Sequence, residues 1–273
     1  MTDAPDIQIH VLDSITKLTD SHRGQVIVAA SHGAEYAAYL AAKGGARAVI
    51  LNDAGVGKDD AGISGLPYLD ALGMAAATVG YRSARIGDGG DMKTRGVISH
   101  VNDAAAALGC AAGQSCNDCA ERMRGAAAVS VSPPPQTENR ILLREEQGAP
   151  PVWGLDSASL AAPEDAGHIV ICGSHGEALG GKPETAFRYD AVAAVFNDAG
   201  IGIDDAGISR LPALDGRNIP AATVSAASAW IGDAKSIYED GVISRVNESA
   251  AARGGQPGQT TAAFVDAIIA SLQ

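Results

Sequence analysis

The sequence predicts an α/β fold made of two tandem Rossmann-like units with mostly parallel sheets, related by internal duplication and pseudo-twofold symmetry. The first observation behind this is a repeat: residues 52–102 align without a gap on residues 197–247 at a constant offset of 145, and 30 of the 51 positions are identical. A repeat of this size is a domain and not one turn of a solenoid. Two such domains are expected to pack as a homodimer does.

The repeat also sets the expected domain boundaries. Residues 1–128 form the first repeat, 129–150 a linker and 151–273 the second repeat. Upstream of the central block the offset is 143, so the second repeat holds two extra residues between Gly176 and Asn197. The linker contains three consecutive prolines, which favour an extended spacer, and its residues 141–143 are expected to form a short strand.

The second observation is that apolar runs of strand length alternate with helix-forming segments. Residues 25–30 are continuously apolar, and a run of helix formers at 35–45 follows, closed by two glycines. Residues 46–51 read as a second buried strand. After a glycine-rich turn, residues 64–73 predict a short helix that stops at a glycine.

The pattern continues to the end of each repeat. Residues 74–80 predict a third apolar strand and 96–101 a fourth, and an Asn-Asp pair is suited to cap a helix over 104–109. A final amphipathic helix is clearest at 260–272. Apolar strands without alternation, separated by helices, are typical of a parallel sheet covered on both faces. Buried helix is the alternative for such short runs.

Composition limits the classes of function. The net charge of -12 argues against a nucleic-acid surface and against anionic membranes. No apolar run reaches the length of a spanning helix, and the first ten residues do not resemble a signal peptide. The four cysteines stand at non-equivalent places in the repeats, which favours reduced thiols and a cytoplasmic protein. Small-molecule partners are expected, and a homo-oligomer is left open.

Three polar motifs follow three of the expected strands. In the first repeat they are the sequences SHG from Ser31, NDAG from Asn52 and SARIGD from Ser83, and the second repeat has SHG from Ser174 and NDAG from Asn197. In an open parallel sheet the carboxyl ends of the strands line the ligand crevice. The three motifs are therefore expected to meet at one edge of each sheet.

The expected catalytic residues are His32 and Asp53 in the first repeat and His175 and Asp198 in the second. Of the six histidines, only His32 and His175 occupy equivalent positions in the two repeats. Histidine is the commonest proton shuttle at neutral pH. A carboxylate at a strand end orients a histidine, acts as a base or binds a metal. The alternative is that SHG and NDAG are turn and capping chemistry.

The expected substrate-binding residues share these loops. Arg85 is suited to grip a carboxylate, whereas the aligned Trp230 is not, which suggests that the first repeat carries the more reactive side chains. Random sequence drift in an exposed loop is an alternative explanation of the difference between Arg85 and Trp230. The full set of binding residues is Ser31, Asn52, Gly55, Ser83, Arg85, Ser174, Asn197, Gly200 and Ser228.

No cofactor is expected. The glycine-rich loop lacks the lysine of a P-loop and the spacing of a dinucleotide fingerprint. A divalent metal held by His32, Asp53 and Asp88 is a weaker alternative without a supporting motif. Cys116 and Cys119 form a single CxxC, which is read as two helix neighbours and not as a redox or zinc site.

These features together predict a cytoplasmic small-molecule enzyme, a hydrolase of an amide or related bond in a small anionic metabolite. It would use His/Asp acid–base chemistry, with backbone N–H groups of the glycine-rich turns stabilising an oxyanion. Three alternatives use the same residues: an isomerase or lyase acting beside a carboxylate, a non-catalytic metabolite-binding protein, and a structural subunit whose repeats only assemble.

Overall fold

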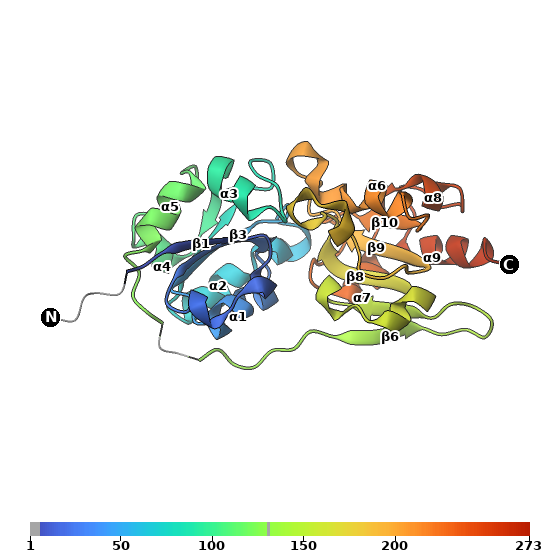
Figure 1. The fold of residues 1–273 in the computed structure, drawn as a ribbon, viewed down its shortest axis with the longest axis horizontal. Coiled ribbons are helices and arrows are strands. Elements are labelled where there is room, and N and C mark those ends of the chain that lie inside the picture. Colours follow the sequence, from blue (N-terminus) through green and yellow to red (C-terminus); the bar gives the residue numbers. More distant parts are fainter. Residues whose placement is uncertain (1–5, 130–131) are drawn as a thin grey trace. The chain divides into compact units, whose positions relative to one another are not determined.

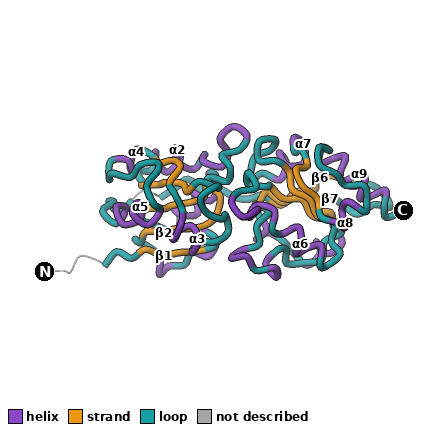
Figure 2. The backbone as a smooth tube through the Cα atoms, turned by 90° about the horizontal axis from the view of Figure 1, so that it is seen from above, coloured by secondary structure: helices purple, strands orange, loops and turns teal. Residues whose placement is uncertain are grey.

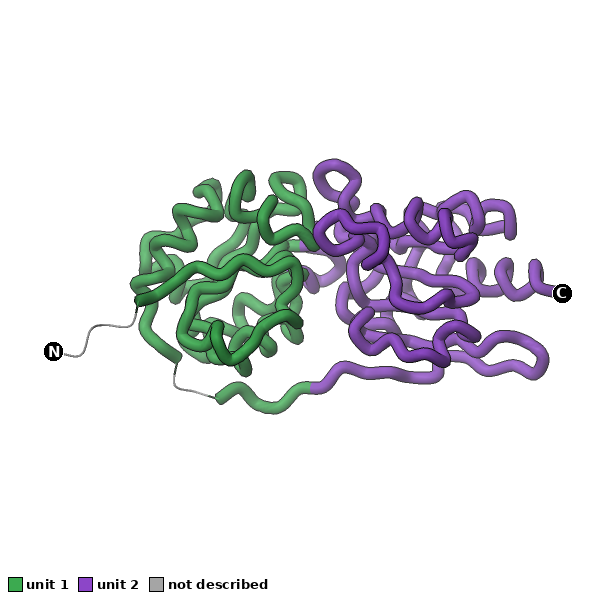
Figure 3. Tube along the Cα trace, in the orientation of Figure 1, with its two compact units in different colours: residues 1–53, 63–136 green, residues 54–62, 137–273 purple. Residues whose placement is uncertain are grey.

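A computed structural model describes residues 6–129 and 132–273 (Figure 1). The chain divides into two compact units (Figure 3). Unit 1 comprises Met1–Asp53 and Ile63–Gln136, and unit 2 comprises Ala54–Gly62 and Thr137–Gln273. The glycine-rich loop that follows Asp53 is thus counted with unit 2, which the two linear repeats of the sequence do not indicate.

Unit 1 contains one five-stranded sheet. The strands lie in the order β1-β2-β3-β4-β5, and all neighbours are parallel except β4 and β5. In chain order the elements are β1 (Ile9–Leu12), β2 (Val26–His32), α1 (Glu35–Lys43), β3 (Ala48–Asn52), α2 (Gly65–Ala71), β4 (Ala75–Val79), α3 (Gly89–Arg95), β5 (Ile98–Val101), α4 (Asp103–Ala106) and α5 (Cys116–Met123).

Unit 2 contains a six-stranded sheet in the order β11-β10-β9-β8-β7-β6, antiparallel only at its two edges. Its elements are β6 (Arg140–Arg144), β7 (Val152–Leu155), β8 (Ile169–His175), β9 (Ala193–Asn197), α6 (Arg210–Asp215), β10 (Ala221–Val224), α7 (Ala234–Asp240), β11 (Ile243–Val246), α8 (Glu248–Ala251) and α9 (Thr261–Ala270).

The expected α/β class with mostly parallel sheets is confirmed. The apolar runs at 25–30, 46–51 and 74–80 are β2, β3 and β4, and residues 141–143 lie within β6. In both sheets the parallel strands are neighbours in the order in which they occur in the chain. A doubly wound sheet instead reverses its strand order at a switch point where the ligand binds. Among the strands in residues 6–129 and 132–273, neither sheet has such a reversal.

Helices cover both faces of each sheet, as the continuous apolar strands predict (Figure 2). In unit 1, Val28 and Ile50 face a core that includes Met92 of α3 and Met123 of α5. The alternate residues of the same strands face α1 and α2. Unit 2 repeats the arrangement, with α7 and α9 on one face and α6 on the other.

The two units differ most after the SHG motif. Unit 1 has the nine-residue helix α1 there, whereas unit 2 has two short 3₁₀ turns, Leu179–Gly181 and Pro183–Thr185. A Gly-Gly pair and a proline in this stretch oppose a continuous helix. The two extra residues of the second repeat fall in this region.

None of the helices in the described ranges is both long and apolar enough to cross a membrane.

Candidate functional site

The carboxyl ends of three strands lie side by side in unit 1. His32 at the end of β2 is the Cα partner of Asn52 at the end of β3, and Asn52 is the partner of Val79 at the end of β4. Backbone bonds continue beyond the strands, from Gly33 N to Asn52 O at 2.7 Å and from Asp53 N to Val79 O at 2.9 Å. The expected convergence of the strand ends is confirmed.

Unit 2 has the same edge. His175 pairs with Asn197, and Asn197 pairs with Val224. Gly176 N donates to Asn197 O at 2.8 Å, and Asp198 N donates to Val224 O at 2.9 Å. The segments that carry the expected catalytic histidines and aspartates are therefore adjacent in each unit.

The Asn-Asp pair ties the second motif to the third. In unit 1 the amide of Asn52 donates to Ala84 O at 3.5 Å, and Asp53 Oδ1 accepts the Tyr81 N–H at 2.9 Å. In unit 2 Asn197 donates to Ala229 O at 3.2 Å, and Asp198 Oδ1 accepts the Ala226 N–H at 2.9 Å. All four side chains are almost fully buried. These hydrogen bonds fix the position of the loop that carries the third motif relative to the carboxyl ends of the strands.

The two histidines have the same local hydrogen bond. His32 Nδ1 accepts the N–H of Ala34 at 3.4 Å, and His175 Nδ1 accepts the N–H of Glu177 at 3.3 Å. Because a neutral imidazole has one acceptor and one donor nitrogen, this bond assigns the proton to Nε2. Among the described residues of unit 1, no carboxylate hydrogen-bonds His32. Its orientation comes from the turn and not from Asp53.

Burial lowers the pKa of His32 to about 4. The imidazole is therefore neutral at neutral pH, because the charged form would lose hydration inside the protein. At this edge of unit 1 the ring presents an Nε2–H hydrogen-bond donor and not a strong base.

The lowered pKa predicts a pH-dependent stability. Between pH 6.5 and pH 4 the unfolded chain protonates His32 while the folded chain does not, so stability falls as the pH falls through this window. The shift corresponds to a loss of about 2 kcal/mol between about pH 7 and about pH 4.5. The free energy of unfolding, measured by urea unfolding at pH 7 and at pH 4.5 for the wild type and for His32→Gln, tests this. The variant should lose about 2 kcal/mol less stability between the two pH values than the wild type does. An equal loss in both proteins would contradict it.

The NDAG loops adopt an uncommon backbone. Ala54, Gly55, Val56 and Gly57 follow one another with φ between 49° and 77°. A β-branched residue such as Val56 rarely takes a positive φ, and such strain persists only where the surroundings impose it. Eight of the nine non-glycine residues with positive φ in the described ranges lie in the two loops: Ala54, Val56, Asp59, Asp60, Ala199, Ile201, Asp204 and Asp205.

The glycines of the two loops make a close backbone contact within unit 2. A Cβ atom on Gly55 would lie 2.8 Å from Gly200 Cα and 2.9 Å from Gly200 N. No side chain fits there, and the positive φ of both residues also favours glycine. The contact gives Gly55 and Gly200 a packing role, whereas the sequence suggested a place where the backbone approaches a ligand.

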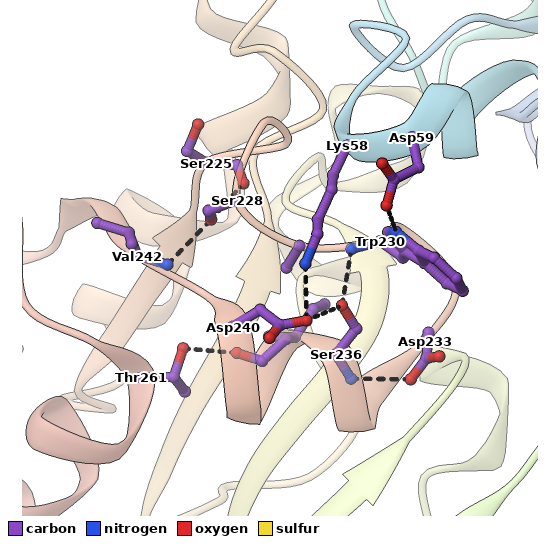
Figure 4. Close-up of polar contacts among 12 residues, drawn as sticks. Lys58, Asp59, Ser225, Ser228, Trp230, Asp233, Ser236, Asp240, Val242 and Thr261 are labelled. Carbon is purple, nitrogen blue, oxygen red and sulfur yellow. Dashed lines mark hydrogen bonds and ion pairs between the residues drawn. The ribbon is translucent and has the colours of Figure 1, made fainter.

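Polar side chains hold the 54–62 loop on unit 2 (Figure 4). Lys58 Nζ lies 2.9 Å from Asp240 Oδ2, and Trp230 Nε1 donates to Asp59 Oδ2 at 2.9 Å. The Lys58 ammonium and Ser236 lower the pKa of Asp240 by hydrogen bonding. The divergence of Trp230 from the aligned Arg85 therefore has a structural reason, because the indole N–H supports this loop.

The serines of the expected site bond to backbone. Ser31 Oγ accepts the Ile15 N–H at 2.9 Å, and Ser83 Oγ donates to Gly80 O at 2.7 Å. Their counterparts do the same: Ser174 accepts from Ala158 N at 3.0 Å, and Ser228 donates to Ser225 O at 2.7 Å. These contacts are those of turn-stabilising residues.

Arg85, expected to grip a carboxylate, is partly exposed. Its guanidinium lies 3.9 Å from the carboxylate of Asp88, and its backbone N–H donates to Asp91 at 2.7 Å.

Two charged residues that the sequence comparison missed lie at the edge of unit 2. Glu177 directly follows Gly176 and is 1% exposed, and Arg210 is 3% exposed. Their aligned residues in the first repeat are Ala34 and Gly65. Charged side chains are almost never fully buried unless paired. The sequence signals for these two residues are the alignment of Glu177, beside the two-residue insertion, with Ala34 and the alignment of Arg210 with Gly65.

The cysteines are all free and buried. Burial raises the pKa of Cys116 to about 12 and also raises that of Cys119. A thiol with a raised pKa is a poor nucleophile and metal ligand. Within the described ranges, no group of three or more His, Cys, Asp or Glu side chains could hold a metal ion.

Two cavities of about 510 Å³ lie beside α6 in unit 2, and Ser209 and Pro212 line both. One also includes Arg245 and Asp215. Neither is lined by His175 or Asp198. These two cavities are therefore separate from the edge at which the repeated motifs meet.

No protein-family model, curated protein or solved structure matches this chain.

Proposed function

We propose that the protein is an enzyme that hydrolyses an amide or related bond in a small anionic metabolite at the carboxyl edge of its sheets. The observation that carries the proposal is the fixed neutral imidazole. His32 accepts a backbone N–H through Nδ1 and has a pKa of about 4, so its Nε2–H is a donor for a carbonyl oxygen at neutral pH.

In this proposal water attacks the carbonyl carbon and gives its proton to the Asp53 carboxylate. The carbonyl oxygen takes the negative charge and is stabilised by the His32 Nε2–H and by backbone N–H groups of the loops. The C–N bond then breaks, and the aspartic acid returns the proton to the leaving amine. Asp53 lies on the strand end next to that of His32, which supports this division of roles.

Arg85 would bind the carboxylate of the substrate. A charged hydrogen bond of this kind contributes about 1.5–3 kcal/mol. His175 and Asp198 would perform the same chemistry in unit 2, where the hydrogen bonds at the strand ends are equivalent.

A second reaction is favoured by the same observation. A neutral imidazole that polarises a carbonyl, together with a carboxylate base, is also suited to removing a proton beside that carbonyl. An isomerase or lyase is therefore the second candidate.

We further propose that the two units arose by internal duplication and that the protein acts in the cytoplasm without a cofactor. The 30 identities in residues 52–102 and 197–247 support the duplication. The recurrence of the Asn and Asp hydrogen bonds at the same positions adds to it.

The test uses the full chain and a panel of small carboxylate-bearing amides and carbonyl acids. Hydrolysis predicts release of an amine or ammonia, whereas the second candidate predicts incorporation of solvent deuterium beside the carbonyl without release. Either activity should disappear in a His32→Ala, His175→Ala double variant. A rate that is the same in the double variant and the wild type would refute the site.

A further inference from the structure

Arg210 is a buried cation at the start of α6 in unit 2. Its backbone N–H donates to Gly176 O at 2.8 Å, and its side-chain Nε donates to His175 O at 3.1 Å. One residue therefore holds both carbonyls of the His-Gly pair. Its guanidinium also lies 4.9 Å from the centre of the Phe196 ring.

The same guanidinium also bonds to backbone carbonyls at the end of the 3₁₀ turns that unit 2 has in place of helix α1. Its Nη1 donates to Thr185 O at 3.3 Å and to Ala186 O. Ala186 is buried, so its carbonyl would otherwise lack a donor inside the protein, which costs about 1–3 kcal/mol, whereas Thr185 is half-buried. Arginine suits the position because its rigid fork carries five donors. Burial lowers the pKa of Arg210 to about 10, so the group stays charged at neutral pH.

Unit 1 has the same backbone hydrogen bond but a glycine in place of the arginine. The residue aligned with Arg210 is Gly65, whose N–H donates to Gly33 O at 2.8 Å. A Cβ atom on Gly65 would lie 2.6 Å from Ala38 Cβ of α1 and 2.7 Å from Gly33 O. Helix α1 thus fills the space in unit 1, and an arginine is sterically incompatible with it.

We propose that Arg210 is the positioning residue of His175, and that it takes this role at a place where unit 1 has Gly65 packed against Ala38 of α1. It holds the His175 carbonyl while the ring bonds the Glu177 N–H, and so it fixes which nitrogen of His175 is presented at the sheet edge. This inference rests on the proposed function only in assigning His175 to the site. The two sites are then unequal: His175 depends on Arg210, and His32 does not.

The test compares the imidazole nitrogens in the full chain by long-range ¹H–¹⁵N NMR, in the wild type, Arg210→Ala and Arg217→Ala. Arg217 is the matched control, because it also bonds a carbonyl of this stretch, that of Phe187 at 2.6 Å, but is partly exposed. We expect Arg210→Ala to convert His175 from one Nε2–H tautomer to a mixture. Exchange of the Glu177 amide should accelerate about tenfold, as loss of one hydrogen bond predicts.

His32 should be unchanged in all three proteins, and Arg217→Ala should leave His175 unchanged. A single Nε2–H tautomer of His175 in folded Arg210→Ala would overturn the proposal. If that variant does not fold, Arg210→Met, which keeps most of the volume against Phe196, is measured with the same two outcomes. Failure of both variants to fold also overturns it, since Arg210 would then support the whole unit. The readout needs no substrate, so it is independent of whether the proposed reaction occurs.

Discussion

In a His175→Ala background, which removes the equivalent site of unit 2, replacement of His32 by alanine is expected to lower kcat/KM about 10²- to 10³-fold, the usual effect of removing one donor to an oxyanion. The physical reason is that the Nε2–H of His32 is a neutral, fixed donor, because Nδ1 accepts the Ala34 N–H and burial holds the pKa at about 4. The substrate found in the panel assay provides the measurement, with kcat and KM determined separately.

His32→Gln distinguishes a donor from a base. A glutamine amide still donates a hydrogen bond but does not accept a proton, so in the same His175→Ala background His32→Gln should be at least about tenfold more active than His32→Ala. His22→Ala is the matched control, because His22 Nδ1 also accepts a backbone N–H, that of Thr19 at 3.0 Å, yet precedes β2. Glutamine and alanine variants that are equally inactive would show that the imidazole is a base and would contradict the donor role.

Replacement of Gly55 by alanine should destabilise the protein by about 2–5 kcal/mol, the sum of two costs. The positive φ costs an alanine about 1–2 kcal/mol, and the clash with the Gly200 backbone adds an overpacking cost of about 1–3 kcal/mol. Gly148→Ala is the matched control: Gly148 has a φ of +83° and no atom within 4 Å of the position that a Cβ would take, so only the backbone cost applies.

Urea unfolding of Gly55→Ala and Gly148→Ala measures the difference. The contact between the two NDAG loops predicts a larger loss for Gly55→Ala by at least about 1 kcal/mol. Equal losses would mean that the loops do not require this close approach.

Much of the fold follows from the sequence because its strands are continuously apolar. Buried strands such as Val26–His32 have few alternatives once they are bounded by glycine-rich turns. The short strands Ile9–Leu12 and Val152–Leu155 were not predicted, because four residues carry too little pattern to separate a strand from a loop. The sequential strand order was not predicted either, since it depends on how the helices pack.

The edge of the sheet was predictable and its contacts were not. Position alone placed His32 and Asn52 at the ends of neighbouring strands and Ser83 in the loop after the next strand. The bonding of Asn52 and Ser83 to backbone depends on the distances between loops, which a single sequence does not contain. The positive φ of Val56 is likewise imposed by tertiary contacts against the preference of the residue. The partners of Arg210 are backbone carbonyls, which no side-chain spacing indicates, so its alignment with Gly65 was the one sequence signal for it and was not used.

The central claim is that His32 is a neutral Nε2–H donor at neutral pH. A pH titration of its ring nitrogens by long-range ¹H–¹⁵N NMR, on the full chain with His32→Gln for assignment, tests it directly. The account predicts the Nε2–H tautomer at pH 7 and a pKa of about 4. An Nδ1–H tautomer, or a pKa at or above the ordinary value of about 6.5, would contradict it.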